Sequence, residues 1–99
     1  MKEELKQIIE HYGIDHQLRK FNEESLELEE AIIKHETLKD YYFKNTNWLK
    51  QHIVEELADV TCVLKQFQYH YGIEDKEIEE VMKFKIERQL ERIKNENNN

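Results

Sequence analysis

The 99-residue sequence predicts an all-α fold, an antiparallel helical bundle of about four helices. It contains no proline and only two glycines, Gly13 and Gly72, whereas strand-rich folds need turn residues at short intervals. Glu, Lys, Leu, Ile and Gln dominate, and most of these favour helix. Apolar residues also recur three and four residues apart, which is typical of amphipathic helices that cross at shallow angles. We expect one domain, residues 1–94, followed by a polar, disordered tail over residues 95–99.

The first two helices are separated by a glycine. Residues 3–12 are predicted to form a short amphipathic helix that ends at Gly13. Asp15 is a suitable N-cap for a second helix over about residues 16–38. The apolar seam expected on this second helix consists of Leu18, Phe21, Ser25, Leu28 and Ile32.

The second half of the chain has the same organisation. The periodicity stops over about residues 39–46, which predicts a loop, and a third helix is expected over about residues 48–71 with Asn47 as its cap. A fourth helix over about residues 76–94 would follow, capped by Asp75. The seam expected on the third helix consists of Ile53, Leu57, Val60, Leu64, Phe67 and Tyr71. The inward residues expected on the fourth helix are Ile78, Val81, Phe84 or Lys85, and Ile86.

Size and charge narrow the classes of function. A chain this short buries only about 60–65% of its unfolded surface, and its hydrophobic fraction is low at 38%, so we expect at least a dimer. The net charge of −7 disfavours direct nucleic-acid binding, which usually needs a basic stripe. Cys62 stands alone and excludes an internal disulfide. No signal-like segment or long apolar run is found, so we expect a cytoplasmic protein with no membrane association.

One acidic pattern occurs twice, each time in the middle of a long predicted helix. The pattern is two acids, two other residues and a third acid, and the two copies are residues 23–27 and 55–59. Residues three apart share a helix side, so Glu24 pairs with Glu27 and Glu56 with Asp59, beside the apolar seams. If the two long helices pair antiparallel, these four carboxylates converge.

Converging carboxylates need a cation unless they are protonated, because they repel one another and burial disfavours their charge. Oxygen ligands select hard ions, so Mg²⁺ is expected, with Mn²⁺ as the alternative, rather than zinc. The His that di-iron sites place three residues after Glu is absent here. The alternative is that both motifs are solvated helix flanks paired with Lys and Arg. Glu23 and Glu55, which lead the two motifs, point elsewhere on their helices and suit a surface or supporting role.

These residues resemble a known family. The strings EESLE and EELAD resemble the paired acidic signature of the MazG-like, all-α nucleoside triphosphate pyrophosphohydrolases. HIVEELADVTCVLKQFQYHYGI is similar to small stand-alone members found in phages and bacteria, and KFKIERQLERI resembles the end of those members. The resemblance covers about residues 12–93.

The resemblance implies a helical bundle that forms dimers or tetramers. It also implies a Mg²⁺-dependent hydrolase that converts an NTP or dNTP to the monophosphate and pyrophosphate. The metal ligands and catalytic residues would be Glu24, Glu27, Glu56 and Asp59. A basic stripe on the last helix would contact phosphate, with ion pairing to neighbouring acids as the alternative; it consists of Lys85, Arg88 and Arg92.

Three further residues are candidates for the nucleobase. Gln17 has an amide that can read a base edge, and Phe21 and Trp48 can stack on a base, although core packing is the alternative for both aromatics. The function alternative from another class is a non-catalytic helical module that senses nucleotide or binds a partner protein. The paired acidic motifs favour the enzyme, because a scaffold has no need of four acids beside a seam.

Overall fold

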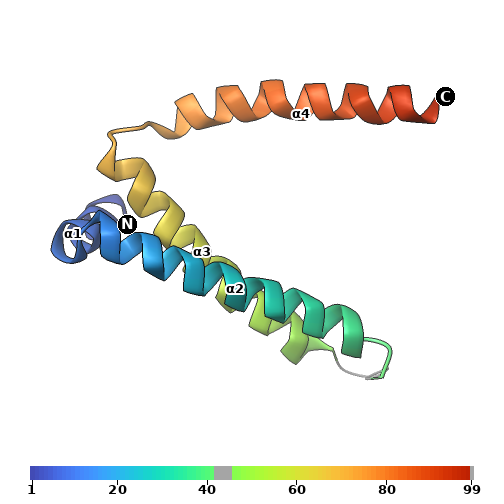
Figure 1. The fold of residues 1–99 in the computed structure, drawn as a ribbon, viewed down its shortest axis with the longest axis horizontal. Coiled ribbons are helices and arrows are strands. Elements are labelled where there is room, and N and C mark those ends of the chain that lie inside the picture. Colours follow the sequence, from blue (N-terminus) through green and yellow to red (C-terminus); the bar gives the residue numbers. More distant parts are fainter. Residues whose placement is uncertain (42–45, 99) are drawn as a thin grey trace.

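The structure is a computed structural model that describes residues 1–41 and 46–98, and this part of the chain contains four α-helices (Figure 1). They are α1 (Lys2–Tyr12), α2 (Ile14–Leu38), α3 (Asn47–His70) and α4 (Asp75–Asn97). The all-α prediction is confirmed. Residues 42–45 of the predicted loop, and Asn99 of the predicted tail, lie outside the described residues. The last helix extends to Asn97, beyond the end at residue 94 that the sequence suggested.

The helix starts differ slightly from the prediction. All four helices begin one or two residues earlier than expected, and the expected caps Asp15, Asn47 and Asp75 therefore lie in the first turns of α2, α3 and α4. The N-cap positions are held by Gly13, Thr46 and Glu74. Gly13 both ends α1 and starts α2, because its φ of 85° is in the left-handed region that glycine adopts without strain.

The core lies where α1, α2 and α3 meet. α2 and α3 run side by side in opposite directions, and α1 packs across them (Figure 1). The buried apolar residues are Ile9 of α1, Ala31 of α2, and Leu49 and Val63 of α3. This core is small, as the low hydrophobic fraction predicts.

The predicted seams are only partly buried. Half-buried members include Phe21 and Leu28 of α2 and Val60 and Phe67 of α3. The other side of each seam faces outward: Leu18, Ile32, Leu57, Leu64 and Tyr71 are 43–65% exposed. The deeply buried positions of α2 are instead Gln17, Glu24 and Ala31. The predicted seam is therefore not the centre of the α2–α3 contact. Periodicity locates an apolar stripe, but it does not show which part of the stripe a neighbouring helix covers.

α4 extends away from the other helices (Figure 1). The prediction that its apolar residues point inward is wrong for the single chain, because all of them are at least one-third exposed. The exposed apolar residues of α4 are Ile78, Val81, Met82, Phe84, Ile86, Leu90 and Ile93. The chain exposes 8163 Å², about 2,000 Å² more than a compact monomer of its mass. Its radius of gyration is 17.5 Å, against about 13 Å for a compact chain of this length.

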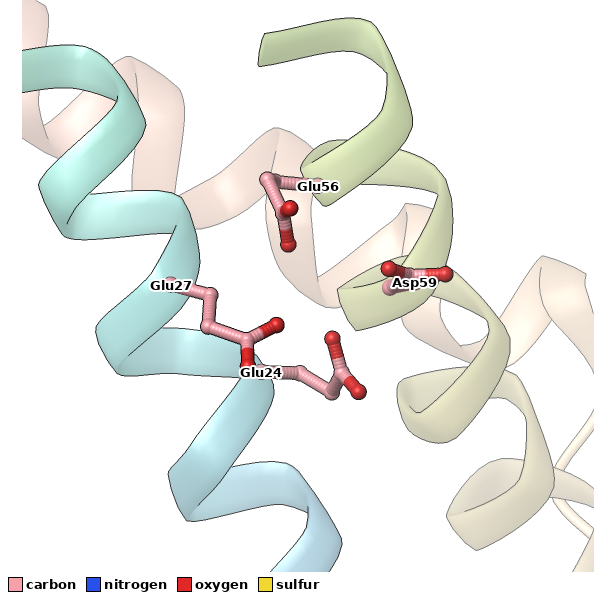
Figure 2. Close-up of side chains that lie close together, drawn as sticks. All are labelled: Glu24, Glu27, Glu56 and Asp59. Atoms are coloured by element: carbon pink, nitrogen blue, oxygen red, sulfur yellow. The ribbon is translucent and has the colours of Figure 1, made fainter. Parts of the chain in front are cut away.

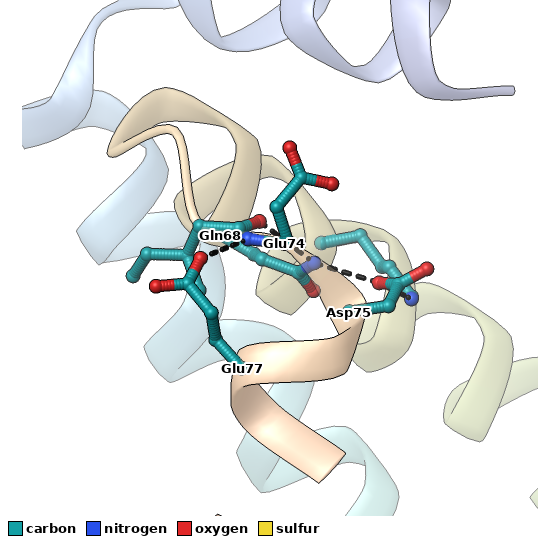
Figure 3. Close-up of polar contacts among 6 residues, drawn as sticks. Gln68, Glu74, Asp75 and Glu77 are labelled. Atoms are coloured by element: carbon teal, nitrogen blue, oxygen red, sulfur yellow. Dashed lines mark hydrogen bonds and ion pairs between the residues drawn. The ribbon is translucent and has the colours of Figure 1, made fainter. Parts of the chain in front are cut away.

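The junction between α3 and α4 is held by polar contacts (Figure 3). Gln68 of α3 donates hydrogen bonds to the Ile73 carbonyl at 3.0 Å and to the Asp75 carboxylate at 2.7 Å. Lys65 pairs with the same carboxylate at 3.0 Å. The Glu74 backbone N–H donates to Glu77 Oε2 at 2.7 Å, which caps the start of α4. These contacts set where α4 leaves α3.

No helix in the described part of the chain has the length and apolar character needed to cross a membrane.

Candidate metal centre

The two acidic motifs lie side by side, because α2 and α3 are antiparallel and each motif is in the middle of its helix (Figure 2). Glu24 and Glu27 come from adjacent turns of α2, and Glu56 and Asp59 from adjacent turns of α3. One carboxylate oxygen from each of the four lies within 4.8 Å of the others. The side chains point into the space between the two helices (Figure 2). The convergence expected from the helix spacing is therefore present.

Two of these carboxylates each have one buried oxygen without a hydrogen-bond partner among the described residues. Glu24 is 6% exposed, and its Oε2 has no hydrogen-bond partner among the described residues. Glu56 Oε2 is also buried and has no hydrogen-bond partner among the described residues. Burying a charged oxygen without a partner costs several kcal/mol in principle. Such oxygens are therefore placed to bind a cation.

The electrostatics of the cluster point the same way. Repulsion from the Glu24 carboxylate is the main cause that raises the pKa of Glu27. Partial desolvation and repulsion from Glu56 raise it further. Burial is the main cause that raises the pKa of Asp59, followed by the charge of Glu24. Both shifts mean that the metal-free site resists full ionisation.

The local cations are too few to neutralise four carboxylates. Lys20 Nζ lies 3.0 Å from Glu24 Oε1, and this contact raises the pKa of Lys20. His52 Nε2 lies 3.5 Å from Glu56 Oε1. Lys20 was not singled out from the sequence, although a Lys four residues before an inward Glu is the signal that would have identified it.

The donor set fits a hard divalent cation. It consists only of carboxylate oxygens, as Mg²⁺ and Mn²⁺ prefer. Oxygens on opposite sides of one such ion are about 4 Å apart for Mg²⁺ and about 5 Å apart for a larger ion, close to the 4.8 Å spacing found here. Glu23 and Glu55 are exposed and lie outside the cluster.

A cavity of about 350 Å³ opens beside the carboxylates. Glu24 and Asp59 lie on its wall, and the wall continues to the junction of α1 and α2. A pocket of this volume is in the range that binds small molecules. The cavity therefore offers space for a ligand that also touches the acidic cluster.

The three candidate base-binding residues are dispersed. Gln17 is buried and lines the cavity. Phe21 packs edge-on against Phe67 with the ring centroids 6.0 Å apart. Trp48 lies in the first turn of α3, where the Lys34 ammonium is 5.5 Å from its ring centroid. Only Gln17 of the three faces the cavity.

The basic stripe is not brought to the cluster within one chain. Lys85, Arg88 and Arg92 are exposed on α4, which does not pack against α2 or α3. Arg88 lies over the ring of Phe84 on its own helix, 5.8 Å from the centroid. A role for this stripe in phosphate binding therefore requires α4 of a second copy.

Comparison of the chain with protein-family models, with curated proteins and with solved structures gives no match. The resemblance to the MazG-like family consequently depends on the motif residues alone and stays a prediction. The arrangement of the four carboxylates is an independent observation on the same residues.

Proposed function

We propose that the protein is a Mg²⁺-dependent nucleoside triphosphate pyrophosphohydrolase, which converts an NTP or dNTP to the monophosphate and pyrophosphate. The observation that supports it most is the group of four carboxylates within 4.8 Å, two of which have a buried oxygen without a partner. A triphosphate is strongly anionic, so a chain with a net charge of −7 needs a cation to bind it.

Glu24, Glu27, Glu56 and Asp59 would hold the metal. When bound, Mg²⁺ would neutralise phosphate charge and lower the pKa of an attacking water. The reaction adds water to the α-phosphorus and breaks its bond to the bridging oxygen, so that pyrophosphate leaves. In this proposal the chain itself does little covalent chemistry and contributes mainly by positioning.

Two features of the chain suit that positioning role. The antiparallel pairing of α2 and α3 keeps the carboxylates at fixed places on rigid helices. Lys20 lies at the boundary of the cluster and the cavity, where its ammonium can contact a phosphate once Glu24 has another cation.

We further propose that the active form is a homodimer or homotetramer. The excess of about 2,000 Å² over a compact monomer is what a standard interface buries, and it includes the outer sides of the apolar seams and all of α4. α4 of a second copy would also bring Lys85, Arg88 and Arg92 toward the substrate, which α4 of the same chain does not do.

The test is a turnover panel. The protein is incubated with each common NTP and dNTP, dUTP and several modified triphosphates, with Mg²⁺ or with a chelator, and the products are separated by chromatography. Metal-dependent release of monophosphate and pyrophosphate is the expected result. Diphosphate and phosphate would show a different point of attack and contradict the proposed reaction. Absence of turnover by folded, Mg²⁺-bound protein would favour the non-catalytic module.

A further inference from the structure

The polar wall of the cavity beside the acidic cluster has an organisation that the proposed reaction does not use. Gln17 of α2 and Gln66 of α3 are 3% and 4% exposed, so two amides are buried together. Gln17 Nε2 donates to Gln66 Oε1 at 2.7 Å. Buried amides cost stability unless they are bonded, which makes this pair a specific and rigid feature.

The hydrogen bonds of this pair have a direction. His16 Nδ1 lies 2.7 Å from Gln17 Oε1, and because an amide oxygen only accepts, the imidazole N–H is the donor. Donation therefore runs from His16 to Gln17 and from Gln17 to Gln66. The Nε2 amino group of Gln66 ends the chain and has no hydrogen-bond partner among the described residues. Gln66 lines the cavity, so an unused donor faces the space that a ligand would enter.

An aromatic surface lies next to this donor. The rings of Tyr12 and His16 are stacked, with centroids 4.6 Å apart and planes 18° apart, and both line the cavity. Gly13 makes the arrangement possible, because its positive φ turns the chain so that the end of α1 meets the first turn of α2. A flat heteroaromatic ring can stack on this surface while its edge meets Gln66.

We infer that this end of the cavity is a nucleobase subsite, in which Gln66 donates to a carbonyl oxygen or ring nitrogen of the base and Tyr12 and His16 provide the stacking surface. This inference rests on the proposed function for its choice of ligand, since Glu24 and Asp59 of the acidic cluster line the same cavity, seven residues along α2 and α3 from Gln17 and Gln66. A nucleotide fits the two ends with its phosphates at the carboxylates and its base at the amides. Gln66 then determines specificity and Gln17 is a positioning residue that holds it.

The test compares two substitutions of Gln66 with one elsewhere. Gln66→Glu keeps an oxygen that accepts from Gln17 but replaces the donor with an acceptor that carries a negative charge when ionised. Gln66→Met removes the whole amide without adding charge. Gln68→Met is the matched control, because Gln68 is also a buried amide of α3 but bonds Ile73 and Asp75 away from the cavity. Thermal melting identifies any variant that fails to fold, and Gln66→Glu remains informative if Gln66→Met does.

The first measurement uses nucleosides, which lack phosphate and therefore do not depend on the metal site. Adenosine, guanosine, cytidine, uridine and thymidine are titrated into ¹⁵N-labelled full-length protein. We expect the side-chain amide signals of Gln17 and Gln66 to shift with the preferred base. Binding should weaken about tenfold in both Gln66 variants, the size of one lost hydrogen bond, and stay unchanged in Gln68→Met. Shifts elsewhere, no binding, or equal binding by the Gln66 variants would overturn the subsite.

The second measurement separates this inference from the proposed function. The ratio of kcat/KM between the best and worst base is compared in the wild type and in the uncharged variant Gln66→Met, with inorganic tripolyphosphate as a substrate that has no base. A smaller ratio with unchanged tripolyphosphate turnover supports the subsite. An unchanged ratio overturns it and leaves the hydrolase intact. If no triphosphate is hydrolysed, the proposed function fails, and the nucleoside titration alone decides the subsite.

Discussion

Acidic side chains meet a neighbouring helix in two places, and the two places are built differently. At the α3–α4 junction, Asp75 accepts a hydrogen bond from Gln68 and pairs with Lys65, and these contacts hold its pKa below the ordinary value (Figure 3). Between α2 and α3, four carboxylates converge (Figure 2). The pKa values of Glu27 and Asp59 are raised there.

The difference separates an acid that holds the fold from acids that could hold a cation. Asp75 Oδ1 meets its two donors, Gln68 and Lys65, within the chain, and the side chain is 59% exposed to water. The carboxylates between α2 and α3 include buried oxygens without partners, and folding alone does not satisfy them. Such an arrangement lowers stability by itself, so a cation that binds it should stabilise the fold. The following predictions test whether the two regions behave in these opposite ways.

The largest expected effect is on turnover. Glu56→Gln should lower kcat by at least ~100-fold, since even outer-shell partners of a metal cost 10–100-fold, while the metal-free variant stays folded or becomes more stable. Glu55→Gln is the matched control, because it removes the same charge from the neighbouring, exposed position and should keep most of the activity. Steady-state kinetics with the best substrate of the panel measures both. Substantial turnover by Glu56→Gln would show that the ligand assignment is wrong.

The next effect is stabilisation by metal. At a Mg²⁺ concentration of about 100 times Kd, the wild type should gain about 2.7 kcal/mol by mass action, detected as a rise in Tm. Glu24→Gln should lose most of this gain because it removes the most buried carboxylate of the cluster. Glu23→Gln, which changes an exposed neighbour, should retain it. A wild type that melts at the same temperature with Mg²⁺ and with chelator would contradict a metal site.

The junction should show the opposite pattern. Gln68→Met removes the two hydrogen bonds that the amide donates, and should lower the free energy of unfolding by about 1–2 kcal/mol. Its gain in stability from Mg²⁺ should equal that of the wild type, because Gln68 lies outside the cluster. Urea unfolding with and without Mg²⁺ gives both quantities. A reduced metal response in Gln68→Met would mean that the two regions are coupled.

The convergence of the carboxylates could be predicted because it depends on local geometry. A spacing of three residues puts Glu24 and Glu27 on one side of their helix, and Glu56 and Asp59 on one side of theirs. The antiparallel pairing of the two helices then brings the four carboxylates together. The location of α4 could not be predicted in this way. Its apolar face has the right period, but periodicity does not state whether the same chain or another copy covers it.

The subsite residues were missed for a related reason. Gln66 lies in the string KQFQYH, where a polar residue next to apolar ones resembles an ordinary surface position. Its burial arises from α1 packing across α2 and α3, a tertiary contact that no short pattern encodes. Gln17 is a candidate from the sequence because its amide can read a base edge. In the structure it lines the cavity and donates a hydrogen bond to Gln66.

The smallest effect is the pH dependence of the metal-free protein. Glu27 and Asp59 have folded-state pKa values above their ordinary 4.5 and 3.8, so the folded chain holds these protons to higher pH than the unfolded chain. Their contribution to stability is therefore fully present below the ordinary values and is lost as pH rises through the raised ones. Asp75 has the opposite sign: its depressed pKa gives stability that is present above 3.8 and is lost as pH falls through the lower value.

The two signs can be separated by substitution. Urea unfolding from about pH 2 to 7, in the absence of metal, should show wild-type stability falling relative to the Glu27→Gln, Asp59→Asn double variant as pH rises. Asp75→Asn should differ from the wild type in the opposite direction, losing its disadvantage as the solution becomes acidic. Saturating Mg²⁺ should remove the first difference, because the bound cation favours the ionised carboxylates, and should leave the second unchanged. A parallel response of both variants would mean that the carboxylates between α2 and α3 are ordinary solvated acids.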